Sequence, residues 1–249
     1  MEFNFSNRTV LITGGTRGIG KKIAEDLLSL GANLILSGTN PVEIEKLNST
    51  AKRDGLPITY FAVDFMKSDQ LNKFIKKLNK FPKIDCIINN AGINRLNYIQ
   101  NAETSDWDDI LAVNLTAPFK LLNVISPLMI QNGYGRVVNI ASIFSKISRE
   151  KRSVYSATKF GIHGLTVGVS NDLARHNILV NTISPGFVLT DLTRQNLSES
   201  EMIALSEQIP AKRLAQTSDI SNIVVFLLSD LNQYLTGQNI VVDGGFTNV

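Results

Sequence analysis

Cysteine, histidine and tryptophan are scarce in this chain of 249 residues. It contains one cysteine, Cys86, two histidines, His163 and His176, and one tryptophan. A single cysteine excludes a disulfide framework within the chain, and its place in the apolar run 84–88 predicts a buried thiol. One cysteine and two scattered histidines leave no spacing that suits a metal site. We therefore expect no metal, and we expect both histidines at core or surface positions.

Strong charge, long apolar runs and a leader sequence are missing as well. The net charge is +3, which is too small and too dispersed to indicate nucleic-acid binding. No apolar run approaches the ~18 residues that a membrane span needs, and residues 1–5 lack the basic and apolar regions of a signal peptide. The G-x-S-x-G elbow of Ser-His-Asp hydrolases is absent. We expect a cytoplasmic protein with neither nucleic-acid nor membrane partners.

Short apolar runs alternate along the chain with longer stretches of helical period. Most runs are continuously apolar, which is typical of strands that are covered on both faces of a parallel sheet. No linker or low-complexity tract interrupts the alternation. It predicts one α/β domain over residues 1–249, with a doubly wound parallel sheet and helices on both faces. The expected strands are 9–12, 33–36, 59–63, 84–88, 136–140, 178–183 and 239–242.

Single residues mark the ends of several expected helices. A helix over 19–30 should end before Gly31, because glycine suits the left-handed position that follows a helix. Pro41 fits the first turn of the next helix. Ser68 can cap a third helix, and Ser218-Asp219 can open a late one in the same way.

A glycine-rich loop follows the first expected strand and opens the first expected helix. It reads Thr13-Gly14-Gly15-Thr16-Arg17-Gly18-Ile19-Gly20. Gly14 permits a tight exit from the strand, while Gly18 and Gly20 let the backbone approach a pyrophosphate. The unpaired N–H groups at the helix N-terminus then face the phosphates. The loop predicts a dinucleotide site, with a G-x-x-x-G-x-G spacing one residue longer than the usual G-x-G-x-x-G.

The end of the second expected strand bears on which nicotinamide cofactor binds. An acidic residue there would bond the ribose 2′-hydroxyl and repel a 2′-phosphate. Gly38 occupies that position here, and Ser37 and Thr39 add neutral hydrogen-bonding groups. Arg17 can reach the same pocket and pair with a phosphate, or it is a solvated loop cation. We predict NADP(H) in preference to NAD(H).

Tyr155 and Lys159 stand four residues apart, with Ser142 thirteen residues before the tyrosine. This spacing puts the tyrosine and the lysine on one face of a helix. An ammonium beside a phenol favours the phenolate and lowers the phenol pKa toward neutral pH. Carbonyl–alcohol redox chemistry needs such a proton donor and acceptor. The pair alone occurs about as often as chance allows, so its context decides.

With the longer glycine spacing and Tyr-x-x-x-Lys downstream, the chain resembles the classical short-chain dehydrogenase/reductase family. The resemblance extends from about Asn7 to Gly245. Residues 208–214 and the C-terminal region are most similar in pattern to bacterial 3-oxoacyl-[acyl-carrier-protein] reductases. The resemblance implies a single-domain Rossmann fold with a seven-stranded parallel sheet, usually assembled as a homotetramer or homodimer.

Further motifs of the family follow in order. Asp64 matches the acid that contacts the adenine, and Asn89-Asn90-Ala91-Gly92 matches the N-N-A-G that shapes the cofactor cleft. Pro185-Gly186 and Thr190 match the segment around the nicotinamide. The resemblance and the loop together predict that the cofactor is bound by Gly14, Thr16, Arg17, Gly18, Ile19, Gly20, Ser37, Gly38, Thr39, Asp64, Asn90, Ala91, Gly92, Tyr155, Lys159, Pro185, Gly186, Val188 and Thr190.

The resemblance also implies a catalytic tetrad of Asn114, Ser142, Tyr155 and Lys159. Tyr155 would pass a proton to or from the substrate oxygen, and Ser142 would hydrogen-bond that oxygen. Lys159 would hold the ribose hydroxyls and lower the tyrosine pKa, while Asn114 would support a water that passes protons to the lysine. The hydride chemistry belongs to the cofactor. A non-catalytic dinucleotide-binding regulator is the alternative from a different class.

The stretch between Ser142 and Tyr155 lines the substrate cleft in this family. It carries four cations against one carboxylate, which are Lys146, Arg149, Lys151, Arg152 and Glu150. An anionic small-molecule substrate is one interpretation of this charge, and a solvated loop is the other.

The identity of the substrate stays open between two groups of enzymes. The overall pattern favours a 3-oxoacyl reductase, but Gly133 and His176 stand at two positions where acyl-carrier recognition often uses basic residues. A sugar or nucleotide-sugar dehydrogenase shares the same general motifs. Residues 190–210 are expected to form the segment that covers the substrate.

Overall fold

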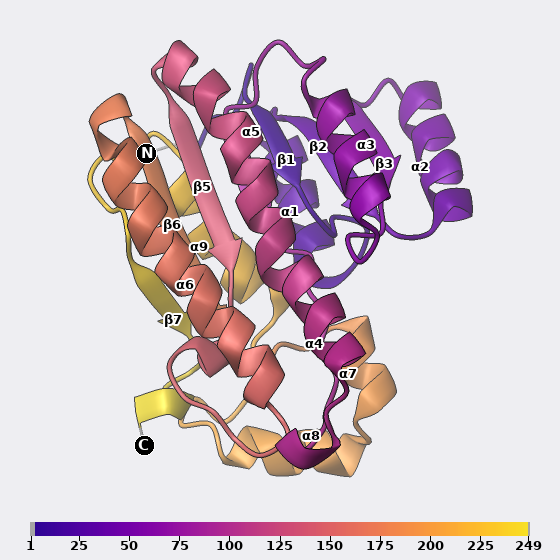
Figure 1. Cartoon of the computed structure of the whole chain (residues 1–249), viewed down its shortest axis with the longest axis vertical. Helices are drawn as coiled ribbons and strands as arrows, with labels where there is room; N and C mark the ends of the chain where they lie inside the picture. Colours follow the sequence, from indigo (N-terminus) through magenta and orange to yellow (C-terminus); the bar gives the residue numbers. More distant parts are fainter. Residues whose placement is uncertain (1–2, 249) are drawn as a thin grey trace.

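A seven-stranded parallel sheet forms the centre of the molecule (Figure 1). The computed structural model describes residues 3–248, apart from the side chains at positions 192 and 196. The strands stand in the order β3-β2-β1-β4-β5-β6-β7, and each neighbouring pair is parallel, which confirms the predicted fold. Their bounds are β1 (Thr9–Ile12), β2 (Asn33–Gly38), β3 (Ile58–Ala62), β4 (Cys86–Asn89), β5 (Gly135–Ile140), β6 (Ile178–Pro185) and β7 (Asn239–Val242).

Helices cover both faces of the sheet (Figure 1). On one face, α1 (Gly18–Ser29) and α9 (Thr217–Leu228) pack against each other. On the other face lie α3 (Ser68–Leu78), α5 (Ala117–Asn132) and α6 (Ser153–Leu173). The helix α2 (Pro41–Arg53) packs beside β3 at the edge of the sheet.

The sheet divides the apolar core into two layers. Successive side chains of a strand point to opposite faces, so Val10 and Ile12 lie in the layer under α1 and α9, and Leu11 lies in the other layer. All three are fully buried. Cys86 on β4 also has no exposed surface, and burial raises the pKa of its thiol, which confirms the predicted buried cysteine. Both faces need apolar side chains, and this requirement explains the continuously apolar runs.

The strand order reverses at β1. The strands β2 and β3 lie on one side of β1, and β4 to β7 lie on the other. Such a reversal leaves a crevice outside the carboxyl ends of the strands, which is where open α/β sheets bind ligands. The loops that follow β1, β2, β3 and β4 meet at this crevice.

The expected strands lie within two residues of the observed ones at each end, but two helix starts differ from the predictions. Helix α3 begins at Ser68 itself, so Lys67 takes the cap position and no side chain caps the helix. Helix α9 begins at Thr217. The Asp219 carboxylate reaches back to accept from the backbone N–H of Gln216 at 2.7 Å, so the cap lies two residues earlier than Ser218.

One long helical stretch, Thr104–Asn132, is apolar by mean hydropathy although it contains no long uninterrupted apolar run. Its mean hydropathy is 1.3 over 18 residues, so by length and composition alone it could cross a membrane. No long apolar run is visible there because polar residues interrupt the stretch. The side chains of Leu121, Ile125 and Met129 are buried against the sheet, which is the position of a core helix.

Candidate active site and cofactor cleft

Glycine is required or favoured at three positions of the loop between β1 and α1. Gly14 and Gly18 have φ angles of +65° and +55°, in the left-handed region that favours glycine. A Cβ on Gly20 would lie 2.3 Å from the carbonyl oxygen of Gly14 and 2.5 Å from Nδ2 of Asn90. Gly18 and Ile19, in the first turn of α1, line the cleft, where unpaired N–H groups favour an anionic ligand.

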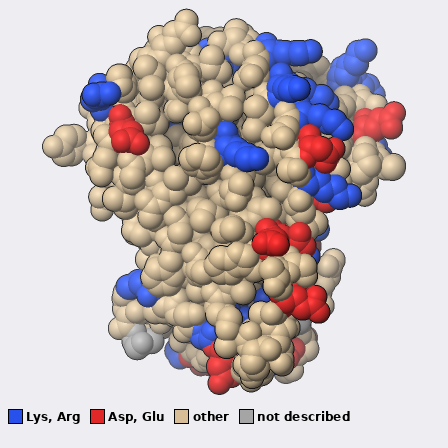
Figure 2. All heavy atoms as spheres, in the orientation of Figure 1, with Lys and Arg blue, Asp and Glu red and all other residues tan. Residues whose placement is uncertain are grey.

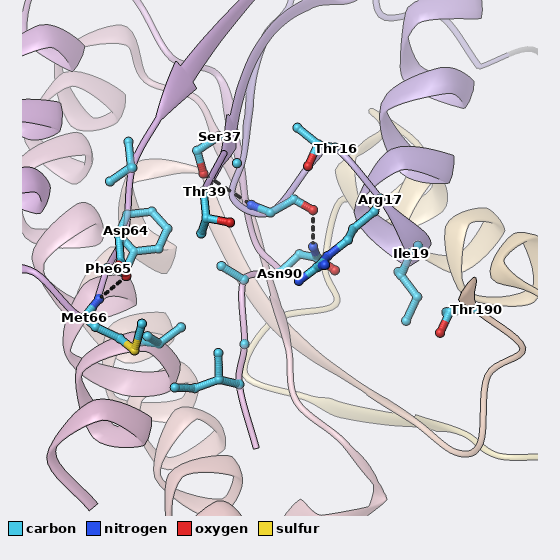
Figure 3. Close-up of a pocket in the computed structure, with 18 of the residues that line it drawn as sticks. Thr16, Arg17, Ile19, Ser37, Thr39, Asp64, Phe65, Met66, Asn90 and Thr190 are labelled. Carbon is cyan, nitrogen blue, oxygen red and sulfur yellow. Dashed lines mark hydrogen bonds between the residues drawn. The ribbon is translucent and has the colours of Figure 1, made fainter. Parts of the chain in front are cut away.

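Asn90 ties the loop after β4 to the glycine loop (Figure 3). Its Nδ2 donates to the carbonyl oxygens of Thr13 and Gly14 at 2.9 and 3.0 Å. In return, Oγ1 of Thr13 accepts from the backbone N–H groups of Asn90 and Ala91, both at 3.0 Å. These four hydrogen bonds hold two walls of the crevice at a fixed separation.

Most of the predicted cofactor residues line one cleft (Figure 3). They are Gly14, Thr16, Arg17, Gly18, Ile19, Ser37, Gly38, Thr39, Asp64, Asn90, Ala91, Gly92 and Thr190. The cleft is also lined by residues that the sequence did not single out, which are Val63, Phe65, Met66, Ile93, Val113 and Asp191. Each of these is the neighbour, or next neighbour, of a predicted site residue, and adjacency is the signal that could have found them.

Six predicted residues do not line this cleft, which are Gly20, Tyr155, Lys159, Pro185, Gly186 and Val188. Pro185 ends β6, and Gly186 donates its N–H to the carbonyl oxygen of Val242. A Cβ on Gly186 would come within 2.9 Å of the backbone of Asp243. This segment therefore packs against the chain that follows β7. It leads to Thr190, which lines the cleft and caps α7 (Asp191–Asn196).

Asn114 lies in a π-helical turn, Ala112–Thr116, between α4 (Thr104–Leu111) and α5. Such turns are rare and frequently occur at functional sites. The side chain is 2 % exposed. Its Oδ1 accepts from the N–H of Ile93 at 2.9 Å, and its Nδ2 donates to the Ile93 carbonyl oxygen at 3.0 Å and to Oγ1 of Thr158 at 3.1 Å. The amide thus fixes the loop after β4 to α6.

Ser142 and Tyr155 come to the site from different elements. Ser142 follows β5, and its Oγ accepts from the N–H of Phe144 at 3.3 Å. Tyr155 lies in the first turn of α6, with its ring edge-on to Phe144 and 6.1 Å between the centroids. Burial raises the pKa of Tyr155, whereas a hydrogen bond with Ser142 and the positive charge of Arg152 lower it.

Lys159 lies one helical turn beyond Tyr155 and is 4 % exposed. Its Nζ donates to the carbonyl oxygen of Ile140 at 2.9 Å and lies 5.4 Å from the centroid of the Tyr155 ring. Burial lowers the pKa of Lys159 to about 8. The groups that lower the tyrosine pKa are therefore Ser142 and Arg152. The expected effect of Lys159 on the tyrosine pKa stays a prediction.

Gly92 connects the cleft to these polar side chains. It lines the cleft, and a Cβ placed on it would lie 3.5 Å from Oδ1 of Asn114 and 3.5 Å from Nζ of Lys159. A ligand that fills the cleft as far as Gly92 therefore meets a buried cation and an amide. Asn114, in the π-helical turn, and Lys159, on α6, lie at this end, and the centroid of the Tyr155 ring is 5.4 Å from Nζ of Lys159.

Neither histidine lines this site. His163 lies on α6, and His176 ends the short 3-10 turn Ala174–His176. Within residues 3–248, no group of three or more His, Cys, Asp and Glu side chains is arranged to hold a metal ion.

Comparison with known proteins identifies the family. The family model described as enoyl-(acyl carrier protein) reductase matches residues 14–247. The chain belongs to the short-chain dehydrogenase/reductase family. A 3-oxoacyl-[acyl-carrier-protein] reductase from Aquifex aeolicus is 36% identical to this family member over 247 residues, which cover 98% of this chain and 99% of the relative. A gluconate 5-dehydrogenase from Gluconobacter oxydans is 32% identical over 247 residues, which cover 98% and 96%.

Solved structures of dehydrogenases and reductases share the fold. A gluconate 5-dehydrogenase from Burkholderia cenocepacia, in complex with NADP and tartrate, has a TM-score of 0.91 and 30% identity, covering 99% of this chain and 98% of that one. The structure described as ElxO with NADP bound has a TM-score of 0.89 and 26% identity, covering 97% and 99%. The present short-chain dehydrogenase/reductase is an NAD(P)-dependent oxidoreductase that acts on CH–OH and C=O groups.

Proposed function

We propose that the protein interconverts a ketone and a secondary alcohol with NADP(H), using Asn114, Ser142, Tyr155 and Lys159 as its catalytic group. The observation that carries this proposal is that Asn114 and Lys159 lie beside Gly92 at the end of the cleft, with the Tyr155 ring 5.4 Å from Nζ of Lys159 and Ser142 next to Tyr155. A buried ammonium is costly unless it is compensated. A regulator that only binds a dinucleotide has no need of that arrangement, so the intact group favours an enzyme.

Each group has one task in the proposed reaction. In reduction, the Tyr155 hydroxyl donates its proton to the substrate oxygen, and in oxidation the phenolate takes the proton back. Ser142 donates a hydrogen bond to the same oxygen and stabilises the negative charge that develops there. When bound, the nicotinamide supplies or accepts the hydride. Lys159 holds the ribose hydroxyls, and Asn114 supports a water that returns protons to the lysine.

NADP(H) is proposed over NAD(H) because of the groups at the end of β2. Gly38 stands where an acid would repel a 2′-phosphate. A Cβ on Gly38 would come within 2.7 Å of Cγ2 of Thr16, so the packing also disfavours a side chain there. Arg17 extends across the cleft from the start of α1, where it can pair with a phosphate (Figure 3). Two of the similar structures contain NADP, in agreement with this proposal.

A 3-oxoacyl thioester is the first substrate class that we propose. The supporting observation is that 3-oxoacyl-[acyl-carrier-protein] reductases recur among the relatives at 32% to 36% identity. A sugar-derived or other short hydroxy acid is the second. It is favoured by the arginines beside Tyr155 and by the gluconate 5-dehydrogenases among the relatives.

A substrate screen with both cofactors tests the proposed function. NADPH consumption is followed with acetoacetyl thioesters, keto acids, keto-sugars and nucleotide keto-sugars, and NADP⁺ reduction is followed with gluconate. We expect kcat/KM of at least about 10⁴ M⁻¹s⁻¹ with one of these classes, and a lower value with NADH. Lack of turnover with every class, or a preference for NADH, contradicts the proposal.

We also propose that α7 and α8 (Glu199–Glu207) cover the substrate. Helix α8 buries none of its described side chains, and the exposed fraction of Ile203 is 58%. Apolar groups on a helix without packing partners are available to close over a ligand. Bound cofactor and substrate should therefore slow tryptic cleavage after Arg194, and an unchanged cleavage rate contradicts this role.

A homotetramer or homodimer is the proposed assembly. Figure 2 shows that the face formed by α5 and α6 is largely free of charged side chains. Phe119 and Phe160, on these two helices, have exposed fractions of 52% and 47%. Exposed apolar surface of this kind marks interaction sites. Light scattering should give the mass of two or four chains of 27.4 kDa, and a monomer contradicts the proposal.

A further inference from the structure

Arg152 lies beside the reacting end of the site. It precedes α6 directly and is three residues before Tyr155. Its guanidinium carbon lies 5.1 Å from the centroid of the Phe144 ring, and the same ring packs edge-on against Tyr155. Stacking of a guanidinium on an aromatic face holds the cation in place and leaves its N–H groups free to bond in their own plane. One aromatic side chain thus positions both the phenol and the arginine.

Arg149 brings a second guanidinium to the same region. Its guanidinium carbon lies 5.6 Å from the centroid of the Phe187 ring. The Phe187 ring packs edge-on against the Phe246 ring, with 5.1 Å between their centroids. Phe187 follows Gly186, so this cation rests on the segment that leads from β6 into the cleft. Burial lowers the pKa of Arg152, Tyr155 opposes that effect, and the charge of Arg149 lowers the pKa further. The two arginines are therefore close enough to repel each other.

Four of the other arginines in the described structure pair with carboxylates, and the buried Arg136 donates to three backbone carbonyl oxygens instead. Arg8, Arg53, Arg95 and Arg213 each contact at least one carboxylate. Among residues 3–248, neither Arg149 nor Arg152 has a carboxylate within 4.0 Å. Arg152 is nevertheless half-buried. A half-buried guanidinium without an anion loses hydration without gaining an ion pair, unless a ligand supplies the anion.

Two lysines of the same stretch behave differently. Nζ of Lys146 donates to Oγ1 of Thr247 and Oδ1 of Asn248 at 3.3 and 3.2 Å. Nζ of Lys151 lies 4.9 Å from the centroid of the Tyr98 ring. Both lysines are exposed. The positive charge of the stretch is therefore divided into three exposed cations, Lys146, Arg149 and Lys151, and the half-buried Arg152 beside Tyr155.

We propose that Arg152, supported by Arg149, binds the carboxylate of the substrate. This inference rests on the proposed function, because it takes Tyr155 and Ser142 as the groups that contact the reacting oxygen. A planar carboxylate is the natural partner of a guanidinium, since two parallel N–H···O bonds match its geometry. Arg152 is three residues from Tyr155, so the carboxylate and the reacting carbon are separated by only a few bonds. The proposal selects the second of the two substrate classes, a short hydroxy acid and its keto acid, because a 3-oxoacyl thioester carries no carboxylate.

The test compares an anion with its uncharged analogue on the NADP⁺-loaded protein. L-Tartrate and L-threitol share the same carbon chain and hydroxyls and differ in two carboxylates against two hydroxymethyl groups. Titration calorimetry should show tartrate binding at least about tenfold more tightly than threitol, the effect of a charge-assisted pair. Equal binding of the two compounds, or no tartrate binding, overturns the proposal.

Two variants assign the effect to one side chain. Arg152→Gln should remove the preference for tartrate, whereas Lys151→Gln, which deletes the same charge one residue away, should change tartrate binding by less than about twofold. Equal effects of the two variants overturn the proposal. The NADP⁺ affinity of each variant reports its folding. If Arg152→Gln loses NADP⁺ binding, the Arg152→Lys variant is used instead. Lysine cannot form the bidentate pair, so this variant should bind tartrate more weakly than the wild type.

Failure of the proposed function gives a different result. If the protein does not reduce ketones with NADPH, the substrate screen is negative, while the tartrate and threitol titrations are still measurable. If only the carboxylate subsite is wrong, the screen is positive, while tartrate and threitol bind equally or Arg152→Gln leaves tartrate binding unchanged. The two proposals can therefore fail separately.

Discussion

The cofactor cleft and the substrate side of this protein are built in different ways. The cleft is formed by backbone and small side chains, and the hydrogen bonds of Asn90 and Thr13 hold its walls together. The substrate side that we propose consists of residues 146–152 and helices α7 and α8, most of whose described side chains are exposed. Ligand binding in the first region thus depends on the space that the glycines leave open. In the second region it depends on where a few charged side chains lie. The cleft should therefore tolerate little change, and the substrate side should respond to single charges.

After Tyr155, the largest loss should come from Ser142, where the two regions meet. Ser142→Ala removes a hydrogen-bond donor from the developing charge, so kcat should fall by about 10²- to 10³-fold. The same change removes the hydrogen bond that lowers the pKa of Tyr155, so that pKa should rise. Because alcohol oxidation needs the phenolate, its activity should appear only at higher pH than in the wild type. A pH profile of kcat/KM checks both effects, and an unshifted profile contradicts the role of Ser142.

The steric character of the cleft is tested next. Gly20→Ala places a Cβ against the carbonyl oxygen of Gly14, and overpacking of this kind costs about 1–3 kcal/mol. NADPH binding, measured by fluorescence titration, should weaken by about 10- to 100-fold. Gly168→Ala is the matched control, because a Cβ there has no heavy atom within 4 Å. Equal affinities of the two variants would show that the glycine loop does not hold the cofactor.

Unlike the glycines that line the cleft, Arg17 is proposed to bind the cofactor through its charge. Arg17→Gln should raise the Kd for NADPH by about tenfold and change that for NADH by less than about twofold, because only NADPH offers the 2′-phosphate. Lys21→Gln, an exposed cation one turn along α1, serves as the control. A parallel loss of NADPH and NADH affinity would contradict recognition of the 2′-phosphate by Arg17.

The smallest effect is expected from Arg152 on proton transfer. Its positive charge lowers the pKa of Tyr155, and the Ser142 hydrogen bond lowers it more. Arg152→Gln should therefore move the pH profile of alcohol oxidation toward higher pH, by less than Ser142→Ala does. Lys151→Gln should leave the profile in place. The comparison is made on a substrate without a carboxylate, so that binding and proton transfer are measured separately.

The two regions also differ in how well the sequence predicts them. The glycine loop and the seven strands could be placed because their residue types are dictated by backbone geometry and by burial on both sheet faces. The tetrad residues could be named from family motifs. The sequence alone did not reveal the π-helical turn that holds Asn114 beside Gly92. A π-helical turn adds one residue to a helix, and this addition leaves no distinct pattern in the amino-acid sequence.

For the substrate side, the sequence predicted only how many charged side chains residues 146–152 carry, and not where these side chains lie. Lys151 and Arg152 are adjacent in the sequence, yet one lies over Tyr98 and the other over Phe144. Lys151 has a φ of +61°, which turns the chain sharply between them. No pattern in the stretch predicts this turn, because the aromatic partners come from elsewhere in the chain or from across the loop. Which cation reaches the site is therefore decided by tertiary contacts.

The most direct test of the proposed chemistry is the turnover of Tyr155→Phe with the best substrate from the screen. The variant keeps the aromatic contact with Phe144 and removes only the proton donor. We predict that kcat falls by at least about 10³-fold while the Kd for NADPH changes by less than about twofold. A kcat within about tenfold of the wild type would contradict Tyr155 as the proton donor, and with it the catalytic group that we assign to this protein.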